Sequence, residues 1–311
     1  MEMNDVYDIV IIGGGPAGFA AGLYAARARL KAVLIEKMGF GGQLLTYEKV
    51  ENYPGFPEGI SAFGLGELFS AHALKFGLET RRGEVVRLGV SDHIKTVYLT
   101  EGALRTKTIV IASGASPNKL GIKGEKELTG RGVSYCAVCD GPFYRNQQVA
   151  VVGGGDTAVE EAIYLTKFAD RVFVIHRRGC LRAMPVIQER ATGNEKISFI
   201  LNTIVTEIQG GNQGVEGLTL RGVQAGEAST LPVSGVFVFV GIQPNANFLP
   251  PEIECNHFGF IHTDQEMATS VPGVFGAGDI RVKELRQIVT AVGDGATAAF
   301  SANRYIESNF R

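Results

Sequence analysis

Residues 7–18 read YDIVIIGGGPAG, an apolar, β-branched run that leads directly into three glycines. The run predicts a buried strand, and the amphipathic pattern after the glycines predicts a helix that ends near Ala28. In a turn between strand and helix, the first glycine permits the tight bend, the second lets a pyrophosphate approach the backbone, and the third lets helix and strand pack closely. The residues of this predicted nucleotide-binding turn are Gly13, Gly15, Pro16, Ala17 and Gly18.

The same order of features recurs from residue 148 onward. Residues 148–152 predict a strand, GGGDTA at 153–158 predicts the turn, and a helical pattern continues to about Phe168. A second apolar strand follows each predicted helix, Ala32 to Glu36 in the first copy and Arg171 to His176 in the second. Two βαβ units in one chain predict two dinucleotide sites. The turn residues of the second site are Gly153, Gly155, Asp156, Thr157 and Ala158.

Two turns that contain proline mark the predicted domain boundaries. Ser116-Pro117-Asn118 and Gln243-Pro244-Asn245 each follow a strand pattern, and a proline stops a strand from continuing. We therefore predict an α/β protein of two Rossmann-like, three-layer dinucleotide-binding domains, the second inserted into the first. The first domain comprises residues 1–117 and 245–311, and the second comprises residues 118–244. Alternation from Ser198 to Leu231 predicts antiparallel strands that cover the inserted domain.

The composition is that of a folded enzyme without a strongly charged binding face. Of 311 residues, 45% are hydrophobic and 20% are charged, and the formal net charge is −2. No long run of one sign occurs, so we predict no nucleic-acid partner and no membrane contact through basic residues. No apolar run approaches the ~18 residues of a membrane span, and the start of the chain lacks the features of a signal peptide. We expect a cytoplasmic protein.

The ends of the second strands differ in charge between the two copies. Glu36 ends the first and can accept hydrogen bonds from a ribose hydroxyl. The second ends in His176-Arg177-Arg178, with Arg182 shortly after. Arginine binds phosphate bidentately, so this end suits the 2′-phosphate of NADPH better than NADH. A basic surface cluster without a ligand is the alternative.

A downstream segment, TSVPGVFGAGD at 269–279, bears on the first copy. It resembles the second FAD fingerprint of two-domain flavin disulfide reductases, in which a short strand ends in Gly-Asp. The resemblance implies that Gly278 and Asp279 bind the ribityl or phosphate region of FAD. Asp279 could instead cap the helix predicted from about Arg286 to Tyr305, and the two roles can coexist. FAD is therefore the ligand expected at the first site.

Two of the four cysteines, Cys136 and Cys139, are spaced as a redox pair. Two intervening residues bring the sulfurs within disulfide reach where the chain turns into a helix, and a helix start stabilises a thiolate. A zinc site would need further ligands, and Cys180 and Cys255 have no partner at metal spacing, with only His257 near Cys255. We predict no metal site, and we expect Cys180 and Cys255 to be small core residues.

The motif CAVCDG at 136–141, followed by GGGDTA and HRR, resembles the low-molecular-weight thioredoxin reductases, and the resemblance covers essentially the whole chain. It implies that Asp140 protonates a departing thiolate, although Asp140 could instead cap a helix. Gly179 replaces the Asp that usually follows the two arginines, and Asp156 stands where many relatives have Asn. Within and beside the segments 41–44, 50–55, 112–115 and 286–287, the residues implied to line FAD are Gly42, Gln43, Asn52, Ala112, Gly114, Arg286, Gln287 and Ile288.

The resemblance also implies an order of reaction. NADPH reduces the flavin, the flavin reduces the Cys136–Cys139 disulfide, and the dithiol reduces thioredoxin or a thioredoxin-like protein. Cys136 attacks the partner, Cys139 faces the flavin, and Asp140 acts as general acid or base. A homodimer is expected on the same ground. Because the cysteines and the second glycine turn share one predicted domain, we expect that domain to swivel about the proline turns and present nicotinamide and disulfide alternately.

Two other functions stay open at this point. A related flavoprotein reductase could act on a different protein disulfide or use another electron donor. A non-catalytic redox sensor would bind FAD without turnover. NADPH consumption with thioredoxin, oxygen or ferredoxin as acceptor, in wild type and in Cys139→Ser, distinguishes the three.

Overall fold

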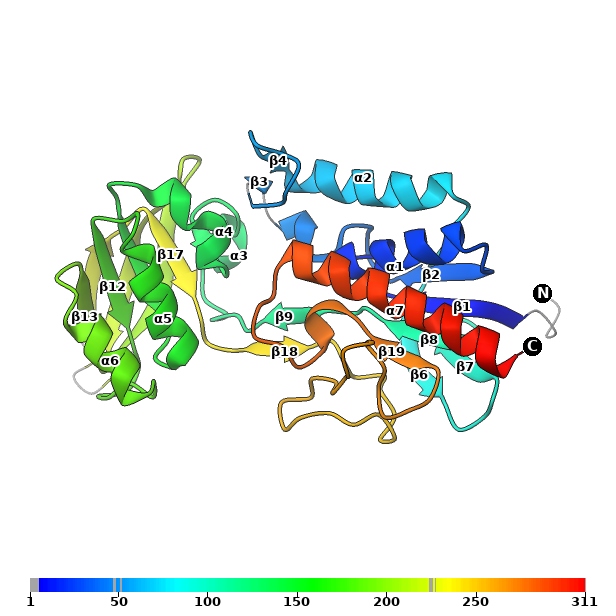
Figure 1. Ribbon diagram of the computed structural model, residues 1–311. Helices are drawn as coiled ribbons and strands as arrows, with labels where there is room; N and C mark the ends of the chain where they lie inside the picture. The colour runs from blue at the N-terminus through cyan, green and yellow to red at the C-terminus, as the bar shows by residue number, and fades with distance from the viewer. Residues whose placement is uncertain (1–5, 47–48, 51, 224–225, 227, 311) are drawn as a thin grey trace. The chain divides into compact units, whose positions relative to one another are not determined.

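The structure is a computed structural model that describes residues 6–46, 49–50, 52–223, 226 and 228–310 (Figure 1). The chain forms two compact units. Unit 1 comprises Met1–Ser116 and Gln243–Arg311, and unit 2 comprises Pro117–Ile242. The chain leaves unit 1 in β9 (Ala115–Pro117) and returns in β18 (Ile242–Pro244), and these two short strands pair with each other.

Unit 1 contains a seven-stranded sheet in the order β5-β2-β1-β8-β7-β6, with β19 also paired to β8. Strands β1, β2, β5, β8 and β19 are parallel, whereas β7 and β6 add an antiparallel edge. The run Ile9–Ile12 is buried on both faces, as expected of a central parallel strand. The strands are β1 (Val6–Ile12), β2 (Ala32–Glu36), β5 (Glu79–Arg82), β6 (Val85–Gly89), β7 (Lys95–Leu99), β8 (Ala103–Ile111) and β19 (Val274–Gly276).

Helices cover one face of this sheet, as Figure 1 shows for α1 and α7. They are α1 (Pro16–Arg27), α2 (Ala62–Lys75) and α7 (Ile288–Asn309). Their alanine-rich faces let α1 and α7 approach closely, and a Cβ added to Gly295 would overlap the carbonyl oxygen of Ala17. The other face packs against side chains such as Ile253, Ile261 and Val271, which come from the segment between β18 and β19. The shorter elements of unit 1 are η1 (Gly42–Thr46), β3 (Lys49–Val50), β4 (Ile60–Ser61) and η3 (Gly278–Ile280).

Unit 2 has three layers around a five-stranded parallel sheet in the order β10-β17-β11-β12-β13. Helices α5 (Asp156–Leu165) and α6 (Pro185–Thr192) contribute to the apolar core on one face. An antiparallel sheet of β14, β15 and β16 packs on the other face. The parallel strands are β10 (Val133–Ser134), β11 (Gln148–Val152), β12 (Arg171–Ile175), β13 (Ile197–Ile200) and β17 (Gly235–Val238). The remaining elements are α3 (Glu125–Leu128), α4 (Ala137–Asp140), η2 (Gly141–Tyr144), β14 (Thr203–Gly211), β15 (Gly214–Gly222) and β16 (Ala228–Pro232).

The predicted fold class is confirmed, since each unit contains the βαβ arrangement read from its glycine turn. Two predicted segments were wrong in extent. Ser198 lies in β13, which is parallel, so the antiparallel strands begin only at Thr203. The helix after the second glycine turn ends at Leu165 rather than near Phe168, and the hydroxyl of the following Thr166 donates back to the carbonyl of Ile163 (2.7 Å).

Candidate redox and dinucleotide-binding sites

The cysteine pair forms a disulfide at the start of a short helix. Cys136 and Cys139 are bonded to each other, with their Cα atoms 5.3 Å apart. Cys136 is the N-cap of α4, and the backbone N–H of Cys139 donates to the Cys136 sulfur (3.2 Å). Once the bond is reduced, the same N–H would stabilise a thiolate on Cys136. The geometry therefore favours Cys136 as the nucleophilic sulfur.

Asp140 is a half-buried carboxyl that follows the pair directly. Burial raises its pKa, while a hydrogen bond from the Ser134 hydroxyl (2.6 Å) acts in the opposite direction. Burial, together with the charge of Asp140, also raises the pKa of Tyr144 to about 12. Asp140 is the last residue of α4, which Cys136 caps, and its side chain makes no cap bond to η2. The alternative of a capping Asp140 was therefore wrong, and a carboxyl with a raised pKa fits a proton donor.

Ser134 links the cysteine pair to this carboxyl, and no sequence pattern predicted this role. Its hydroxyl accepts the N–H of Cys136 (3.1 Å) as well as donating to Asp140. The side chain is buried at the end of β10. A serine between an apolar strand and a CxxC motif is the only pattern that could have drawn attention to it.

The first glycine turn has the geometry that its residue types predict. Gly13 has a φ of 109°, and a Cβ there would overlap the carbonyl oxygen of Ala112. A Cβ on Gly18 would overlap the carbonyl oxygen of Gly13. At Gly15, by contrast, the nearest neighbouring atom would be the Cα of Gly42, 4.0 Å away. Two glycines are therefore required by packing, and Gly15 leaves open space at the N-terminus of α1, where a pyrophosphate fits.

Glu36 holds the shape of this turn. Its Oε2 accepts the N–H of Gly14 (2.7 Å) and its Oε1 accepts the N–H of Met38 (2.8 Å). A Cβ on Gly14 would lie 3.2 Å from the Glu36 side chain. Each carboxylate oxygen has two lone-pair directions, so acceptor capacity is left for ribose hydroxyls. The role of Gly14, which packs on Glu36, was missed from sequence.

Gly278 and Asp279 belong to η3, and Gly278 lies beside the same turn. A Cβ on Gly278 would be 2.9 Å from the Cβ of Ala17, in the first turn of α1. Within the described part of the chain, Asp279 Oδ1 is buried without a hydrogen-bond partner, and burial raises the Asp279 pKa despite the opposing charges of Lys283 and Arg286. A buried acceptor without a donor is costly, and a ribityl hydroxyl would supply that donor. Both residues therefore fit FAD.

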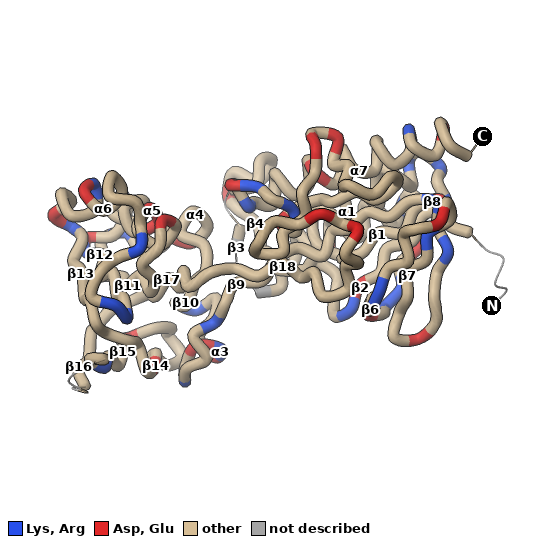
Figure 2. The backbone as a smooth tube through the Cα atoms, turned by 90° about the horizontal axis from the view of Figure 1, so that it is seen from below, with Lys and Arg blue, Asp and Glu red and all other residues tan. Residues whose placement is uncertain are grey.

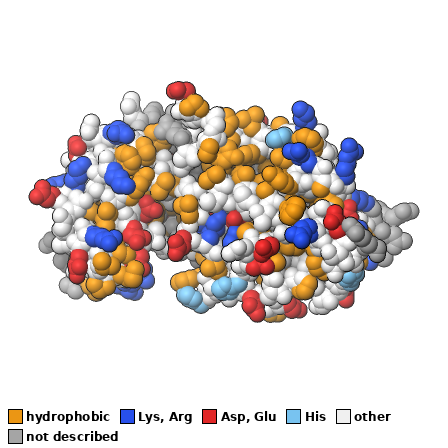
Figure 3. All heavy atoms as spheres, viewed as in Figure 1, with side chains coloured by type: hydrophobic (Ala, Val, Ile, Leu, Met, Phe, Trp, Pro, Cys, Tyr) orange, Lys and Arg blue, Asp and Glu red, His pale blue; other side chains and the backbone are white. Residues whose placement is uncertain are grey.

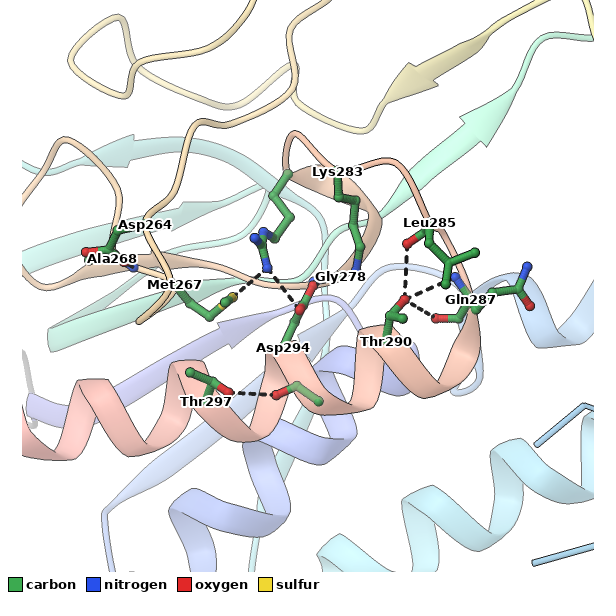
Figure 4. Close-up of polar contacts among 12 residues, drawn as sticks. Asp264, Met267, Ala268, Gly278, Lys283, Leu285, Gln287, Thr290, Asp294 and Thr297 are labelled. Carbon is green, nitrogen blue, oxygen red and sulfur yellow. Dashed lines mark hydrogen bonds and ion pairs between the residues drawn. The ribbon is translucent and has the colours of Figure 1, made fainter. Parts of the chain in front are cut away.

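Asp279 is not the cap of α7, so that alternative was wrong. The N-cap is Gln287, which forms a capping box with Thr290. Asp294, one turn further on, accepts from Arg281 (2.9 Å), from Lys283 (2.8 Å) and from the N–H of Gly278 (3.1 Å), as Figure 4 shows. The exposed fractions of these three side chains are 11–16%. Asp294 therefore holds the backbone of the Gly278 turn in place through the Gly278 N–H. No sequence pattern predicted this role.

The other residues predicted along FAD also lie in unit 1. Gly42 approaches the first turn, because its added Cβ would be 3.0 Å from the Cα of Gly15. The side-chain amide of Asn52 donates to the side chain of Gln287 (3.0 Å), and that of Gln43 donates to the carbonyl of Ala115. Glu51, in the segment 50–55 that is implied to line FAD, lies outside the described residues. Ala112 packs at Gly13, and Gly114 has a φ of 69°. The Arg286 guanidinium lies 4.6 Å from the centre of the Phe260 ring, and Ile288 is the first residue of α7.

The second glycine turn repeats the first with different neighbours. A Cβ on Gly153 would overlap the carbonyl oxygen of Phe239, whereas one on Gly155 would have only Arg182 nearby, 3.9 Å away. The Asp156 carboxylate accepts the N–H of Met184 (2.7 Å), so this departure from the family pattern has a local structural partner. The remaining turn residues begin α5, with Thr157 exposed and Ala158 buried.

The strand end after β12 is basic, as predicted. His176 is buried, and its pKa is lowered by burial and by the positive charges of Arg182, Arg178 and Arg177. The imidazole is therefore neutral at physiological pH, and it packs under the turn, where a Cβ on Gly154 would be 2.5 Å from its Nδ1. Arg177 and Arg178 line a hollow of about 640 Å³ together with Arg221 of β15, which the sequence did not indicate. The structure thus places three arginines at one site.

Cys180 and Cys255 are both exposed, so the expectation that they are core residues was wrong. Each lies in a loop, Cys180 after β12 and Cys255 between β18 and β19. In the ranges that the structure describes, no group of three His, Cys, Asp or Glu side chains could hold a metal ion. No helix within those ranges is long and apolar enough to cross a membrane.

Comparisons with known proteins agree with this geometry. The family described as "Pyridine nucleotide-disulphide oxidoreductase" matches residues 7–295. The chain is 46% identical to the thioredoxin reductase of Peptoclostridium litorale over 99% of both chains, and 45% identical to that of Bacillus subtilis over 99% and 97%. It is also similar to the crystal structure of thioredoxin reductase from Streptococcus pyogenes, with a TM-score of 0.95 and 45% identity over 98% and 99% of the two chains.

Proposed function

Because the chain belongs to the thioredoxin reductases of the pyridine nucleotide-disulphide oxidoreductase family, we propose that the Cys136–Cys139 disulfide is its redox centre, with FAD bound by unit 1 and NADPH by unit 2. The protein is an oxidoreductase that acts on a sulfur group, with FAD and NADPH as cofactors and thioredoxin as protein substrate. The observation that carries the assignment of the redox centre is the disulfide at the N-terminus of α4.

The two cysteines perform the exchange in a balanced sequence. Two electrons and two protons convert the Cys136–Cys139 disulfide into a dithiol. The Cys136 thiolate, which the Cys139 N–H stabilises, attacks one sulfur of the thioredoxin disulfide, and the other thioredoxin sulfur leaves. Cys139 then attacks the Cys136 sulfur of this mixed disulfide, which restores the internal disulfide and releases thioredoxin as a dithiol.

Asp140 supplies or accepts the proton that this exchange requires. Its raised pKa keeps part of the carboxyl protonated closer to neutral pH than an ordinary aspartate. The Ser134 hydroxyl orients the carboxyl and contacts the backbone of Cys136 as well. Asp140 is thus held beside the nucleophilic cysteine in a fixed orientation.

The residues of unit 1 suit FAD, which when bound supplies the ring that accepts hydride from NADPH and returns two electrons to the disulfide. The open backbone at Gly15 and the N-terminus of α1 would hold the pyrophosphate. Glu36 would accept from a ribose, and the buried Oδ1 of Asp279 would accept from the ribityl chain. The Asn52–Gln287 pair at the start of α7 would lie beside the ring, by analogy with the family.

The residues of unit 2 suit NADPH. The turn at Gly155 leaves the N-terminus of α5 open to a pyrophosphate, as the equivalent turn does in unit 1. Arg177 and Arg178 carry the charge that a 2′-phosphate requires. The disulfide and this site belong to one unit, so we expect unit 2 to alternate between two orientations. A cross-link between the units should stop turnover and leave FAD bound, and unchanged turnover would contradict the alternation.

A homodimer is the expected assembly. The exposed apolar side chains of α2 and α7 include Phe63 (57% exposed), Leu68 (52%) and Phe300 (59%). Figure 3 shows hydrophobic side chains gathered over this part of unit 1. Self-association would bury them. Light scattering should give twice the mass of the chain, and a single-chain mass would contradict the dimer.

We expect no nucleic-acid partner and no membrane partner, and a cytoplasmic location. Figure 2 shows basic and acidic residues interspersed along both units. Such a distribution lacks the continuous basic face of a nucleic-acid or anionic-membrane site. Filter binding with duplex DNA and sedimentation with anionic vesicles at physiological salt should both be negative.

One assay tests the function and its alternatives. Wild type should consume NADPH with thioredoxin as acceptor and only slowly with oxygen or ferredoxin. Cys139→Ser should be yellow and bind FAD as wild type does, yet it should lose thioredoxin reduction because no internal disulfide can form. Thioredoxin reduction by this variant would contradict the proposed redox centre. FAD binding without any turnover in wild type would instead favour a redox sensor.

A further inference from the structure

Unit 2 has a hollow that is lined by three arginines. Arg177 and Arg178 reach it from the loop after β12, and Arg221 reaches it from the end of β15. Ile204 of β14 and Val223 supply apolar walls to the same hollow, whose volume is about 640 Å³. Arg177 and Arg178 were predicted to bind a phosphate, but Arg221 comes from a different sheet.

The backbone fixes these two segments beside each other. The N–H of Asn202 donates to the carbonyl of Arg178 (3.1 Å), and the carbonyl of Asn202 accepts from the N–H of Val223 (2.8 Å). The next residue, Thr203, donates its N–H to the carbonyl of His176 (3.0 Å). One short connection between β13 and β14 therefore holds the arginine loop to the end of β15. Arg221 owes its position to regular secondary structure rather than to a mobile loop.

Positive charge dominates the described lining of the hollow. Of its described lining residues, three are arginines and none is acidic. Gly179 occupies the place where the family pattern has Asp, and a Cβ there would lie 3.1 Å from the Asn202 Oδ1. A carboxylate at this position would both crowd Asn202 and pair with the arginines. The arginines are therefore left to bind a ligand that carries more than one negative charge.

We propose that Arg221 is a specificity-determining residue that binds the 2′-phosphate of NADPH together with Arg177 and Arg178. The inference rests on the proposed NADPH site and adds to it an arginine from a different sheet. A 2′-phosphate carries up to two negative charges and offers three acceptor oxygens, which one arginine cannot satisfy. NADH has a hydroxyl at this position, so Arg221 gains no charge pairing from it. Arg221 thus contributes to discrimination between the two nucleotides.

The test compares Arg221→Ala with a matched control, Arg171→Ala. Arg171 is an exposed arginine at the opposite end of β12, so its removal changes net charge equally without touching the hollow. Calorimetry on the FAD-loaded protein should show that Arg221→Ala weakens binding of 2′,5′-ADP roughly tenfold, the usual effect of one charged hydrogen-bonding partner. Binding of 5′-AMP should change less than about twofold, as should both ligands with Arg171→Ala.

Kinetics and a conservative variant sharpen the result. The KM for NADPH should rise about tenfold in Arg221→Ala while the KM for NADH stays within about twofold. Arg221→Lys should restore part of the loss, since it returns the charge without the bidentate geometry. Inorganic phosphate should compete with 2′,5′-ADP only weakly; equal affinity for both would show a general anion site and overturn the assignment.

Two failures can be told apart. If wild type binds 2′,5′-ADP no better than 5′-AMP, the proposed use of NADPH fails, and this inference fails with it. If wild type discriminates but Arg221→Ala weakens both ligands equally, or neither, only the role of Arg221 is wrong.

Discussion

The two glycine turns have similar backbone geometry. They differ in the side chain that lies against the middle one of their three consecutive glycines. In unit 1 this glycine, Gly14, donates its N–H to the carboxylate of Glu36. In unit 2 it is Gly154, which packs on the neutral, buried ring of His176, with Arg177 next along the chain. The turn itself makes room for a pyrophosphate in either unit. We therefore expect the end of the following strand, acidic in one unit and basic in the other, to select the nucleotide.

Asp140 and Asp279, two carboxyls with raised pKa values, differ in their hydrogen-bond partners. Burial raises the pKa of both Asp279 in unit 1 and Asp140 in unit 2. Asp140 has an internal donor, Ser134, whereas the buried Oδ1 of Asp279 has none in the described ranges. A group that keeps its partner inside the protein suits a proton-transfer role, and one without a partner suits a ligand. From this contrast we expect Asp140 to transfer protons and Asp279 to bind a ligand.

The largest expected effect is a difference in stability between variants of Gly18 and of Gly15 in the glycine turn of unit 1. Gly18→Ala would drive a methyl group into the carbonyl oxygen of Gly13, so it should lower the free energy of unfolding by about 3 kcal/mol or more. Gly15→Ala finds open space in the protein alone, so the apoprotein should unfold like wild type. It should nevertheless lose FAD affinity, because the methyl group occupies the approach of the pyrophosphate. Thermal unfolding with and without FAD measures both, and equal apoprotein stability of the two variants would contradict the division of roles.

Asp294→Asn should have the next largest effect. It leaves Arg281 and Lys283 without a full counter-charge at 16% and 11% exposure, and breaking a pair that is largely buried costs about 2–4 kcal/mol. It also weakens the support of Gly278, so FAD affinity should fall more than apoprotein stability alone explains.

A matched control for this variant is Asp8→Asn in β1 of the same unit. Asp8 pairs with Lys107 at the N-terminal end of β1, where the two side chains are 21% and 28% exposed. This variant should cost about 1 kcal/mol and leave FAD affinity unchanged. Chemical denaturation and flavin titration of both variants provide the comparison; an equal loss of FAD affinity would show that Asp294 has no special relation to the flavin turn.

A third experiment replaces the middle glycine of each turn, Gly154 or Gly14, by alanine. Gly154→Ala places a methyl group 2.5 Å from a buried imidazole atom, so we expect a loss of about 1–3 kcal/mol and weaker NADPH binding. Gly14→Ala meets the Glu36 side chain at 3.2 Å, and that chain needs to yield by only a few tenths of an ångström. A loss below about 1 kcal/mol is expected there. The reverse order of the two losses, measured by denaturation, would mean that the turns do not differ as described.

Sequence patterns located both turns, their strands and the cysteine pair, because these depend on local periodicity and on residue types with few alternatives. Strand β11 and strand β2 match their predicted ranges in full. Asp294 and Arg221 were missed because their importance comes from neighbours farther away along the chain. Ser134 was missed although its partners Cys136 and Asp140 are near in sequence, because a single serine has no periodicity or spacing that marks it. The possible capping role of Asp279 was wrong, since only the structure shows that Gln287 is the N-cap of α7. Exposed Cys180 and Cys255 show that an apolar residue type alone does not establish burial.

The smallest expected effect tests the internal partner of Asp140. The Ser134 hydrogen bond favours the ionised carboxyl, so Ser134→Ala should raise the pKa of Asp140 further, by less than about one unit. Because the protonated form donates the proton, the decline of thioredoxin reduction with rising pH should move to higher pH. A folded-state pKa above the unfolded value also means that stability falls as pH rises between the two, and this fall should extend further in the variant. Asp140→Asn is the control, since it should be slow and lack this pH-dependent step; an unshifted pH profile in Ser134→Ala would show that Ser134 only shapes the backbone at Cys136.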